Sequence, residues 1–423
     1  MSKNKSIKVP FSIILSTVFI AVFCDIKTIN SYLVAGIVDE DSGPMALLYM
    51  VSAIGAFFSG ILFSQWKGRK FSKPLLFIII WVTLFYLITN SFIGRPFTTF
   101  IFFAVLTLVS FLLPSITQIN ARLFLRLSMI LSIPAVFRID DIFVFARYSD
   151  TISMGQSYAF LFPVVASIVY LFVYFKDDSF LWKVISIVLF LVNGVYAYYL
   201  VFFGSRGPVF ALISLVFFLL VFRHSEEENR IRSGKGRFAI ATTFAIVVLF
   251  SFVTLMSFLQ DVMGDYGISL GFVDKFLSLG DKGDMSNGRQ DLFAISFADI
   301  IRNPIFGMGF DQFYNNHGNN GLAYPHNFII QILYDGGIVL FLVLGIPIWK
   351  GLKKVWKSCS KDEYAVVVAL AFGSIPRALF SGDLWQNGPL WMFFGILLCE
   401  KFVVSQYLID KKIINYLNNE RIS

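Results

Sequence analysis

Runs of about twenty apolar residues recur along this chain, and they constrain its fold more than any other feature. Such a run is the length that an α-helix needs to cross a hydrocarbon layer about 30 Å thick. Two of the charge-free stretches within these runs are 77–86 and 239–250. Hydrophobic residues make up 57% of the 423 residues and charged residues only 15%, whereas a soluble domain has about 25% charged residues. We therefore predict an all-α, polytopic membrane protein.

Backbone groups in lipid must bond within their own segment, so each run is predicted to be a transmembrane helix. Short loops rich in Lys and Arg mark the cytoplasmic side. Such residues gather in alternate loops, at 67–73, 223–237 and 350–361, whereas the intervening loop expected at 25–43 is acidic. Both termini are therefore predicted to be cytoplasmic. About twelve spans are expected, at 10–25, 44–63, 74–93, 97–114, 121–137 (interrupted by Arg122 and Arg126), 158–175, 180–203, 207–222, 238–258, 327–348, 364–380 and 388–404.

The longest segment outside these spans defines the expected domain organisation. Residues 1–258 form transmembrane helices one to nine, 259–325 an external loop, and 326–423 helices ten to twelve with a cytoplasmic tail. The net charge of +8 comes from basic residues in short loops, which favours membrane topology over nucleic-acid binding. Cys24, Cys359 and Cys399 show neither the spacing of a metal site nor a disulfide framework.

The external loop carries the most polar motifs. Leu292, Phe293 and Phe297 recur at helical spacing, and Asn303-Pro304 is predicted to end that helix, because a residue before proline avoids the α region. Two glycines at 307 and 309 then predict a tight turn. A Gly- and Asn-rich stretch at 315–321 leads to His326 and Asn327 at the mouth of the tenth predicted span.

Three basic side chains are predicted on the same external side: Arg206, Arg289 and His326. A guanidinium grips diphosphate oxygens in bidentate fashion, and an imidazole exchanges a proton near neutral pH. Gly204 and Gly207 flank Arg206. The alternative interpretation of Arg206 is a snorkelling side chain that anchors the end of a helix. Because no G-x-x-x-x-G-K-[ST] phosphate loop is present, an activated lipid donor is favoured over a nucleotide.

Three further residues have two interpretations each. Arg377, near the external end of the eleventh predicted span, either joins the cationic set or snorkels. His317 is expected to be a solvated loop histidine, with substrate binding as the alternative. Asp335, within the tenth predicted span, is either a functional intramembrane acid or the lining of a helix break at Gly336-Gly337.

Together these residues resemble the C-terminal signature of the O-antigen ligase and polymerase superfamily. The elements are Asn287-Gly288-Arg289, the segment 303–309, His326-Asn327 and the segment 335–338, preceded by Ser205-Arg206-Gly207. The resemblance covers roughly residues 200–350 by motif, and the whole chain by span number and loop placement. It departs at Asp335, where the family often has Glu, and the external loop is modest in size.

The resemblance implies an inverting, metal-independent glycosyltransferase of the membrane GT-C type, which needs no cofactor. Its donor would be a polyprenyl-diphosphate-linked oligosaccharide within the membrane lipid. By carry-over, Arg206 and Arg289 would hold the leaving diphosphate and His326 would activate or orient the acceptor hydroxyl. Arg377, Asn327 and His317 are the further candidate substrate contacts.

The expected function is polymerisation of surface polysaccharide (O-antigen, capsule or exopolysaccharide) on the outer face of a bacterial inner membrane. A chain-length regulator protein is an expected partner, and nucleic acid is not. The alternative within the superfamily is an O-antigen ligase, which transfers glycan to lipid A core. The alternative from another class is a flippase or transporter of lipid-linked oligosaccharide, although the sequence shows no internal symmetry of the kind that transporters often have.

Overall fold

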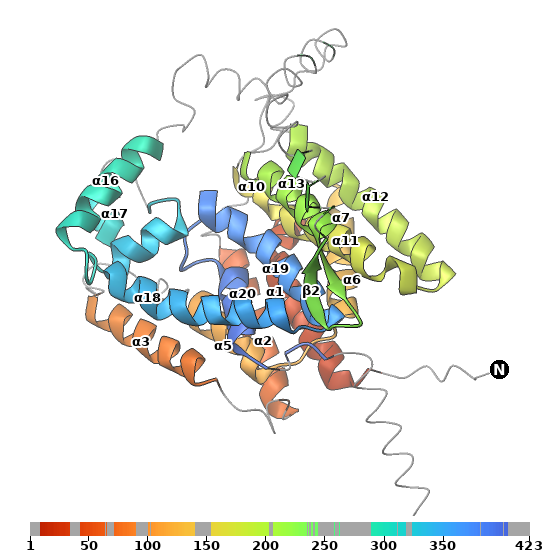
Figure 1. The fold of residues 1–423 in the computed structure, drawn as a ribbon, viewed down its shortest axis with the longest axis horizontal. Helices are drawn as coiled ribbons and strands as arrows, with labels where there is room; N and C mark the ends of the chain where they lie inside the picture. The colour runs from red at the N-terminus through yellow and green to blue at the C-terminus, as the bar shows by residue number, and fades with distance from the viewer. Residues whose placement is uncertain are drawn as a thin grey trace, which may run out of the picture.

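In the computed structural model the chain is mostly helical, and a two-stranded hairpin packs at the side of the helix bundle (Figure 1). The structure describes residues 9–33, 43–63, 65, 72–89, 100–101, 103–139, 154–202, 206–234, 236, 238–239, 242–243, 258, 262, 289–310, 312–318, 324–380, 382–400 and 402–404.

The elements follow one another in two groups. The first group is α1 (Phe11–Leu33), α2 (Gly43–Leu62), α3 (Lys73–Thr89), the π-helical turn η1 (Ala104–Val109), α5 (Ser110–Ile116), α6 (Ala121–Leu131), α7 (Ile133–Val136), α10 (Met154–Ala159), α11 (Leu161–Tyr174), the 3₁₀ turn η2 (Phe175–Asp177), α12 (Phe180–Phe202) and α13 (Arg206–Val221). The second group is β1 (Phe222–Ser225), β2 (Arg230–Ser233), α16 (Arg289–Arg302), α17 (Gln312–His317), α18 (Phe328–Lys357), α19 (Lys361–Phe380) and α20 (Gly388–Leu398).

Within the described residues, five helical segments are long and apolar enough to cross a membrane. They are Phe11–Leu33, Ser157–Asp177, Phe180–Leu200, Phe328–Lys357 and Lys361–Phe380. Shorter apolar helices occupy five more of the predicted spans: Leu47–Leu62, Lys73–Thr89, Ala104–Ile116, Gly207–Val221 and Gly388–Leu398. The predicted span 121–137 is split into α6 and α7 at Ser132. The predicted span 238–258 lies outside the described residues, apart from isolated positions.

The first helix extends well beyond its predicted end. We expected it to end at residue 25 and to be followed by an acidic loop, but α1 continues to Leu33. Asp25 is only 1% exposed and Lys27 only 8%. The prediction was wrong because charged residues were interpreted as loop residues, whereas this part of α1 lies against α10, where the Thr28 hydroxyl donates to the Ala159 carbonyl at 2.5 Å.

Ion pairs join helix ends at one face of the bundle. Arg126 of α6 binds Asp178, which follows η2, at 2.9 Å. Lys361, at the start of α19, contacts Asp177 of η2 at 2.6 Å and Glu226 of the hairpin turn at 2.8 Å. Asp177, Asp178, Glu226 and Lys361 fall in loops predicted to lie on the cytoplasmic side. Arg126 lies near the start of a predicted span that begins on that side. The contacts therefore agree with the predicted alternation of the spans.

The hairpin is a feature that the all-helical prediction did not include. β1 and β2 pair in antiparallel fashion, with Arg223 opposite Arg232. The turn residue Asn229 has a φ of 45°, and its carbonyl accepts a hydrogen bond of 2.9 Å from the Cys359 amide. The Tyr364 hydroxyl donates to the Phe222 carbonyl at 2.6 Å. The hairpin thereby covers the connection between α18 and α19.

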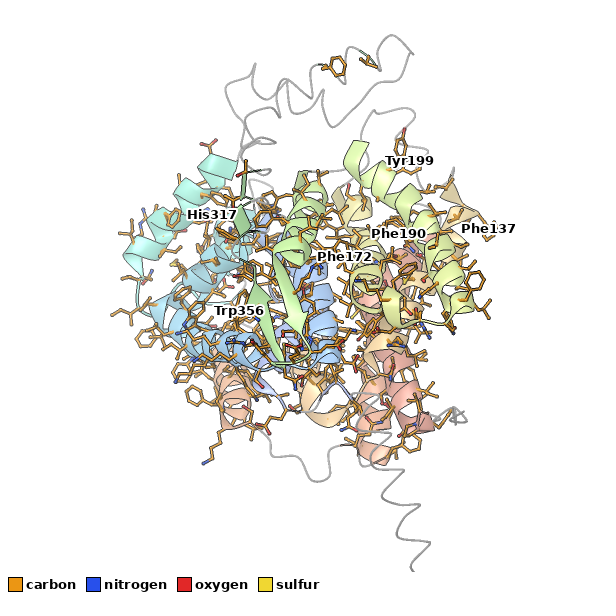
Figure 2. The ribbon with its side chains drawn as sticks, turned by 45° about the vertical axis from the view of Figure 1, so that its right-hand side comes forward. Phe137, Phe172, Phe190, Tyr199, His317 and Trp356 are labelled. Atoms are coloured by element: carbon orange, nitrogen blue, oxygen red, sulfur yellow. The ribbon has the colours of Figure 1, made fainter. Side chains whose placement is uncertain are left out.

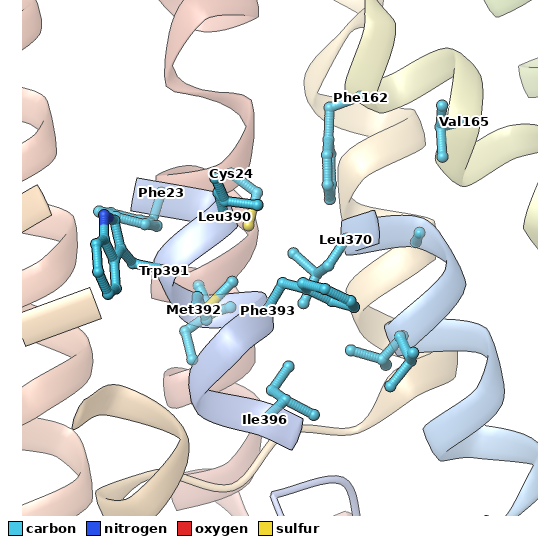
Figure 3. Close-up of a cluster of buried hydrophobic side chains, with 14 of the residues drawn as sticks. Phe23, Cys24, Phe162, Val165, Leu370, Leu390, Trp391, Met392, Phe393 and Ile396 are labelled. Carbon is cyan, nitrogen blue, oxygen red and sulfur yellow. The ribbon is translucent and has the colours of Figure 1, made fainter. Parts of the chain in front are cut away.

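The main core lies where α1, α11, α19 and α20 meet. Figure 3 shows Phe23 and Trp391 on one side of this cluster and Phe162 on the other, with Leu370 and Phe393 between them. Glycines permit the close approach of these helices, because a Cβ on Gly373 would overlap the Phe162 ring.

Many large apolar side chains point outward from the bundle. Phe137 is 85% exposed and Phe172 46% (Figure 2). Exposed apolar residues also cover α3, α12 and α13, for example Ile80 and Leu191. Helices that are apolar on their outer faces as well as in their contacts are typical of a membrane protein.

Candidate functional site

The start of α13 lies against the end of α19. A Cβ on Gly207 would overlap the Tyr158 hydroxyl and would lie 3.5 Å from the Phe380 Cβ. The rings of Phe210 and Phe380 are 5.6 Å apart. Arg206 is the first residue of α13, so its backbone is fixed beside the last turn of α19. Its side chain lies outside the described part of the structure.

The start of α18 meets the same turn of α19. Asn327 is its N-cap, since Oδ1 accepts hydrogen bonds from the amides of Ile329 at 3.0 Å and Ile330 at 3.2 Å. The Asn327 Nδ2 donates to the Leu379 carbonyl at 3.3 Å. The side chain predicted to bind substrate therefore caps α18 and ties it to α19.

His326 precedes this cap in a left-handed backbone conformation, with a φ of 55°. Residues other than glycine rarely adopt it, and where they do it often marks a functional position. The imidazole is half-buried, and its centroid lies 4.4 Å from that of the Tyr324 ring. The left-handed turn thus directs the chain from Pro325 into the capped helix.

The last turns of α19 are consequently the meeting point of three predicted site segments. Arg377 belongs to these turns, one helical turn before Phe380, and is half-buried. Its carbonyl accepts a hydrogen bond of 2.7 Å from the Gly382 amide. The structure brings the backbones of Arg206, His326 and Arg377 to one end of the bundle.

Arg289 is the first residue of α16, which packs against α18. Its side chain lies outside the described residues, so its contact with the other cations stays a prediction. The predicted end of this helix is confirmed, because α16 stops at Arg302, directly before Asn303-Pro304.

A break in α18 organises the loop that follows α16. Gly337 has a φ of 60° within an otherwise helical segment. Hydrogen bonds from the loop replace those lost at the break: the amides of Met308 and Gly309 donate to the carbonyls of Tyr334 and Asp335 at 2.7 and 2.9 Å. In return, the amides of Ile338 and Val339 donate to the carbonyls of Pro304 and Ile305 at 2.9 and 3.2 Å. These four bonds satisfy backbone groups that lipid cannot.

Two glycines permit this docking. A Cβ on Gly307 would crowd the backbone of Tyr334 and Asp335, and a Cβ on Gly337 would overlap the backbone of Ile305. Both residues also have positive φ values, 69° and 60°, which glycine adopts without strain. The motif glycines are therefore needed for the contact between the loop and α18.

The helix break expected after Asp335 is confirmed at Gly337. The Asp335 carboxylate, on a residue 2% exposed, accepts a hydrogen bond of 2.6 Å from the Trp385 indole. The Phe310 ring, 4.2 Å from that of Trp385, is buried against Tyr86 of α3. The Phe310 amide also donates to Thr89 Oγ1 at 3.2 Å. The segment after the motif is thus anchored at the end of α3.

His317 is not the solvated loop residue that we expected. It ends α17, its side chain is 20% exposed, and its Nε2 lies 2.8 Å from Asp299 Oδ2. Figure 2 shows it on the side of the molecule that carries α16. The Tyr334 hydroxyl donates to the same Asp299 oxygen at 3.3 Å. One carboxylate therefore connects α16, α17 and α18.

Asp299, Tyr334 and Trp385 were not predicted from the sequence as part of the site. A signal for Asp299 was present, since it follows Leu292 by seven residues and so lies on the same side of a helix. No comparable signal existed for Trp385, whose contact with Asp335 spans 50 residues.

Residues 194–345 match the family described as O-antigen ligase. This segment is a little over a third of the chain and agrees with the extent of the resemblance, roughly 200–350. It includes Arg206, Arg289, His317, His326 and Asn327, but not Arg377. The resemblance to the O-antigen ligase and polymerase superfamily is therefore confirmed. No curated protein matches the sequence.

Proposed function

We propose that this membrane protein of the O-antigen ligase and polymerase superfamily is a polysaccharide polymerase. It joins polyprenyl-diphosphate-linked repeat units on the outer face of a bacterial inner membrane. The observation that carries the proposal is the meeting of α13, α18 and α19, which holds the backbones of Arg206 and His326 beside Arg377. A cluster of two guanidiniums and an imidazole at a membrane surface suits a diphosphate leaving group.

The proposed reaction is a single displacement. The acceptor hydroxyl oxygen forms a bond to the anomeric carbon of the donor glycan, while the bond from that carbon to the diphosphate oxygen breaks. The electron pair leaves with the polyprenyl diphosphate, whose charge Arg206 and Arg289 neutralise, with Arg377 as a further cation. His326 accepts the hydroxyl proton. Attack from the opposite side inverts the anomeric centre, and no metal is required in this scheme.

Asn327 takes a positioning role in this proposal. Its side-chain Oδ1 accepts hydrogen bonds from backbone amides of α18, and its side-chain Nδ2 donates to a backbone carbonyl of α19. The cap fixes the direction in which the chain leaves His326. His317 is proposed to contact the substrate from the external side, held in place by Asp299.

The proposed topology places both termini in the cytoplasm, with about twelve spans of the GT-C type. It is supported by the ion pairs at the opposite end of the bundle, where Lys361 meets Asp177 and Glu226. The hairpin and the connection between α18 and α19, which belong to two of the predicted basic loops, meet at that end, as expected of a cytoplasmic face.

Complementation of a deletion strain tests the proposal. Wild type and His326→Ala, Arg206→Ala and Arg289→Ala are compared at matched membrane expression, with the lipid-facing Leu191→Ala as control. We expect wild type and control to restore a multi-repeat ladder, and the three site variants to leave single-repeat glycan. Normal ladders from all three site variants would refute the site and favour a transporter.

One observation favours the ligase alternative: the matched family is described as O-antigen ligase. A ligase would use the same cationic site with a lipid A core sugar as acceptor. If the protein is a ligase, the strains that carry the site variants would accumulate long polymer on the lipid carrier and would have no attached glycan.

A further inference from the structure

The last turns of α18 carry exposed lysines that face one way. With about 100° between successive residues of a helix, Lys350, Lys353 and Lys357 lie within about 60° of one another. Within the described part of the chain, no carboxylate lies within ion-pair distance of these three ammonium groups. Lys354, farther round the helix, differs, because it pairs with Glu400 at 3.4 Å. We call Lys350, Lys353 and Lys357 the α18 lysine face.

The same side of α18 is apolar in the turns before the lysines. Leu342 is 46% exposed and Ile346 is 49% exposed, and both are turned by less than 90° from Lys350. Leu340 and Leu344, on the other side of the helix, are buried in the bundle. An apolar outward side of this kind is expected where a helix faces lipid. The exposed side of α18 therefore passes from lipid-facing residues directly to cations.

Trp349 lies at the boundary between these two parts. Its side chain is 58% exposed, and the Lys353 ammonium lies 5.0 Å from the centre of its ring. Exposed tryptophans gather at the level where hydrocarbon meets headgroups. The lysine face extends over about 10 Å of the helix, and the headgroup layer is about 5–8 Å deep. Because lysine stems are long and flexible, all three ammonium groups can reach this layer.

Other cations at this end of the bundle have partners within the protein. Arg126 pairs with Asp178 at 2.9 Å. On the hairpin, Glu228 accepts hydrogen bonds from both Arg230 and Arg232. The hairpin itself packs beside the end of α18, next to Trp356, which Figure 2 labels. The charges of the α18 lysine face are thus available to an anion outside the protein.

We propose that the α18 lysine face binds the headgroup phosphate of an anionic phospholipid. The ammonium groups contact the phosphate oxygens, while the acyl chains of the same lipid lie along Leu342 and Ile346. The lipid belongs to the leaflet at this end of the bundle, which is the inner leaflet in the proposed topology. This site lies apart from the candidate site at the end of α19 and does not depend on the reaction proposed there.

Two other occupants fit less well. A zwitterionic phospholipid carries an ammonium group of its own, which offsets the attraction of the lysines for its phosphate. An acidic segment of a soluble protein would approach from the water, whereas Lys350 directly follows Trp349 at the edge of the hydrocarbon. The order of apolar residues, tryptophan and lysines along one side of α18 therefore favours an anionic membrane lipid.

The test measures lipid binding to the full chain purified in detergent. Phosphatidylglycerol and phosphatidylethanolamine are titrated separately, and native mass spectrometry counts the bound lipid. The test variant is Lys350→Gln/Lys353→Gln, and Lys350→Arg/Lys353→Arg keeps the charge at the same positions. Arg230→Gln/Arg232→Gln is the matched control, since it removes two positive charges from exposed positions of the hairpin.

We expect wild type to bind phosphatidylglycerol more tightly than phosphatidylethanolamine. The Lys→Gln variant should weaken phosphatidylglycerol binding roughly 25-fold, about fivefold for each lysine. The Lys→Arg variant and the hairpin control should keep the wild-type affinity. Unchanged phosphatidylglycerol binding in the Lys→Gln variant, or an equal loss in the hairpin control, would overturn the proposal. Tighter binding of a decaglutamate peptide than of phosphatidylglycerol at the same lysines would also overturn it and would indicate an acidic protein partner.

Discussion

At the residue scale, Asp299 is the point where α16, α17 and α18 are joined. It lies 2.8 Å from His317 Nε2 and 3.3 Å from the Tyr334 hydroxyl. Asp299→Ala should lower the free energy of unfolding by about 1–3 kcal/mol, because it leaves buried donors unpaired. Asp291→Ala, at an exposed position of the same helix, should have little effect. Thermal unfolding in detergent measures both, and equal Tm values for the two variants would contradict this role of Asp299.

The two motif glycines give a second prediction at the residue scale. Gly337→Ala should abolish the contact between the loop and α18, because a Cβ there overlaps the Ile305 backbone and a positive φ costs a non-glycine residue about 1–3 kcal/mol. Gly345→Ala, in the same helix with no atom within 4 Å of the added Cβ, should be tolerated. Yield of folded protein and the surface-polysaccharide ladder restored in the deletion strain should both separate these variants. Full activity of Gly337→Ala would show that the break is dispensable.

At the scale of elements, the hairpin shields the connection between α18 and α19. Burial, and then the charge of Glu363, raises the pKa of the Cys359 thiol to about 12. A thiolate fraction of about one part in ten thousand is expected at pH 8, so alkylation should be slow and should rise about tenfold per pH unit. Mass spectrometry of maleimide-treated protein measures the rate at Cys359.

The matched control for this measurement is Glu227→Cys in the exposed hairpin turn. At pH 8 this cysteine should be alkylated while Cys359 stays largely unlabelled. Removing the 2.7 Å contact between His224 and the Cys359 carbonyl, in His224→Ala, should speed the reaction of Cys359. Rapid labelling of Cys359 in the unaltered protein would show that the hairpin does not protect it.

Elements differ in how well the sequence predicted them. Unbroken apolar runs located most helices, and Asn303-Pro304 located the end of α16, because both signals are local. The break at Gly337 was one of two open interpretations, since glycine pairs occur in continuous helices as well. The extension of α1 beyond Asp25 was missed because burial of a charge depends on neighbours distant in sequence. The contacts of His317 with Asp299, and of Asp335 with Trp385, are likewise tertiary.

At the scale of the whole molecule, two ends of the bundle carry different chemistry. One end holds the ion pairs of Arg126 with Asp178 and of Lys361 with Asp177. The other end holds the segments of Arg206, His326 and Arg377. The proposed topology predicts that Glu227→Cys is labelled only from the cytoplasmic side, and Asn315→Cys, exposed on α17, only from outside. Membrane-impermeant maleimide on intact and permeabilised cells distinguishes the sides. Labelling of both positions from one side would refute this topology.

We propose that the chain polymerises lipid-linked repeat units at the site around the end of α19. The most direct test is the purified protein in vesicles supplied with a polyprenyl-diphosphate-linked single repeat and no lipid A core acceptor. We expect a ladder of multi-repeat, lipid-linked products for wild type and for the control Leu191→Ala, and none for His326→Ala. An unreacted single repeat with wild type, followed by glycan transfer once lipid A core is added, would contradict polymerase function and identify a ligase.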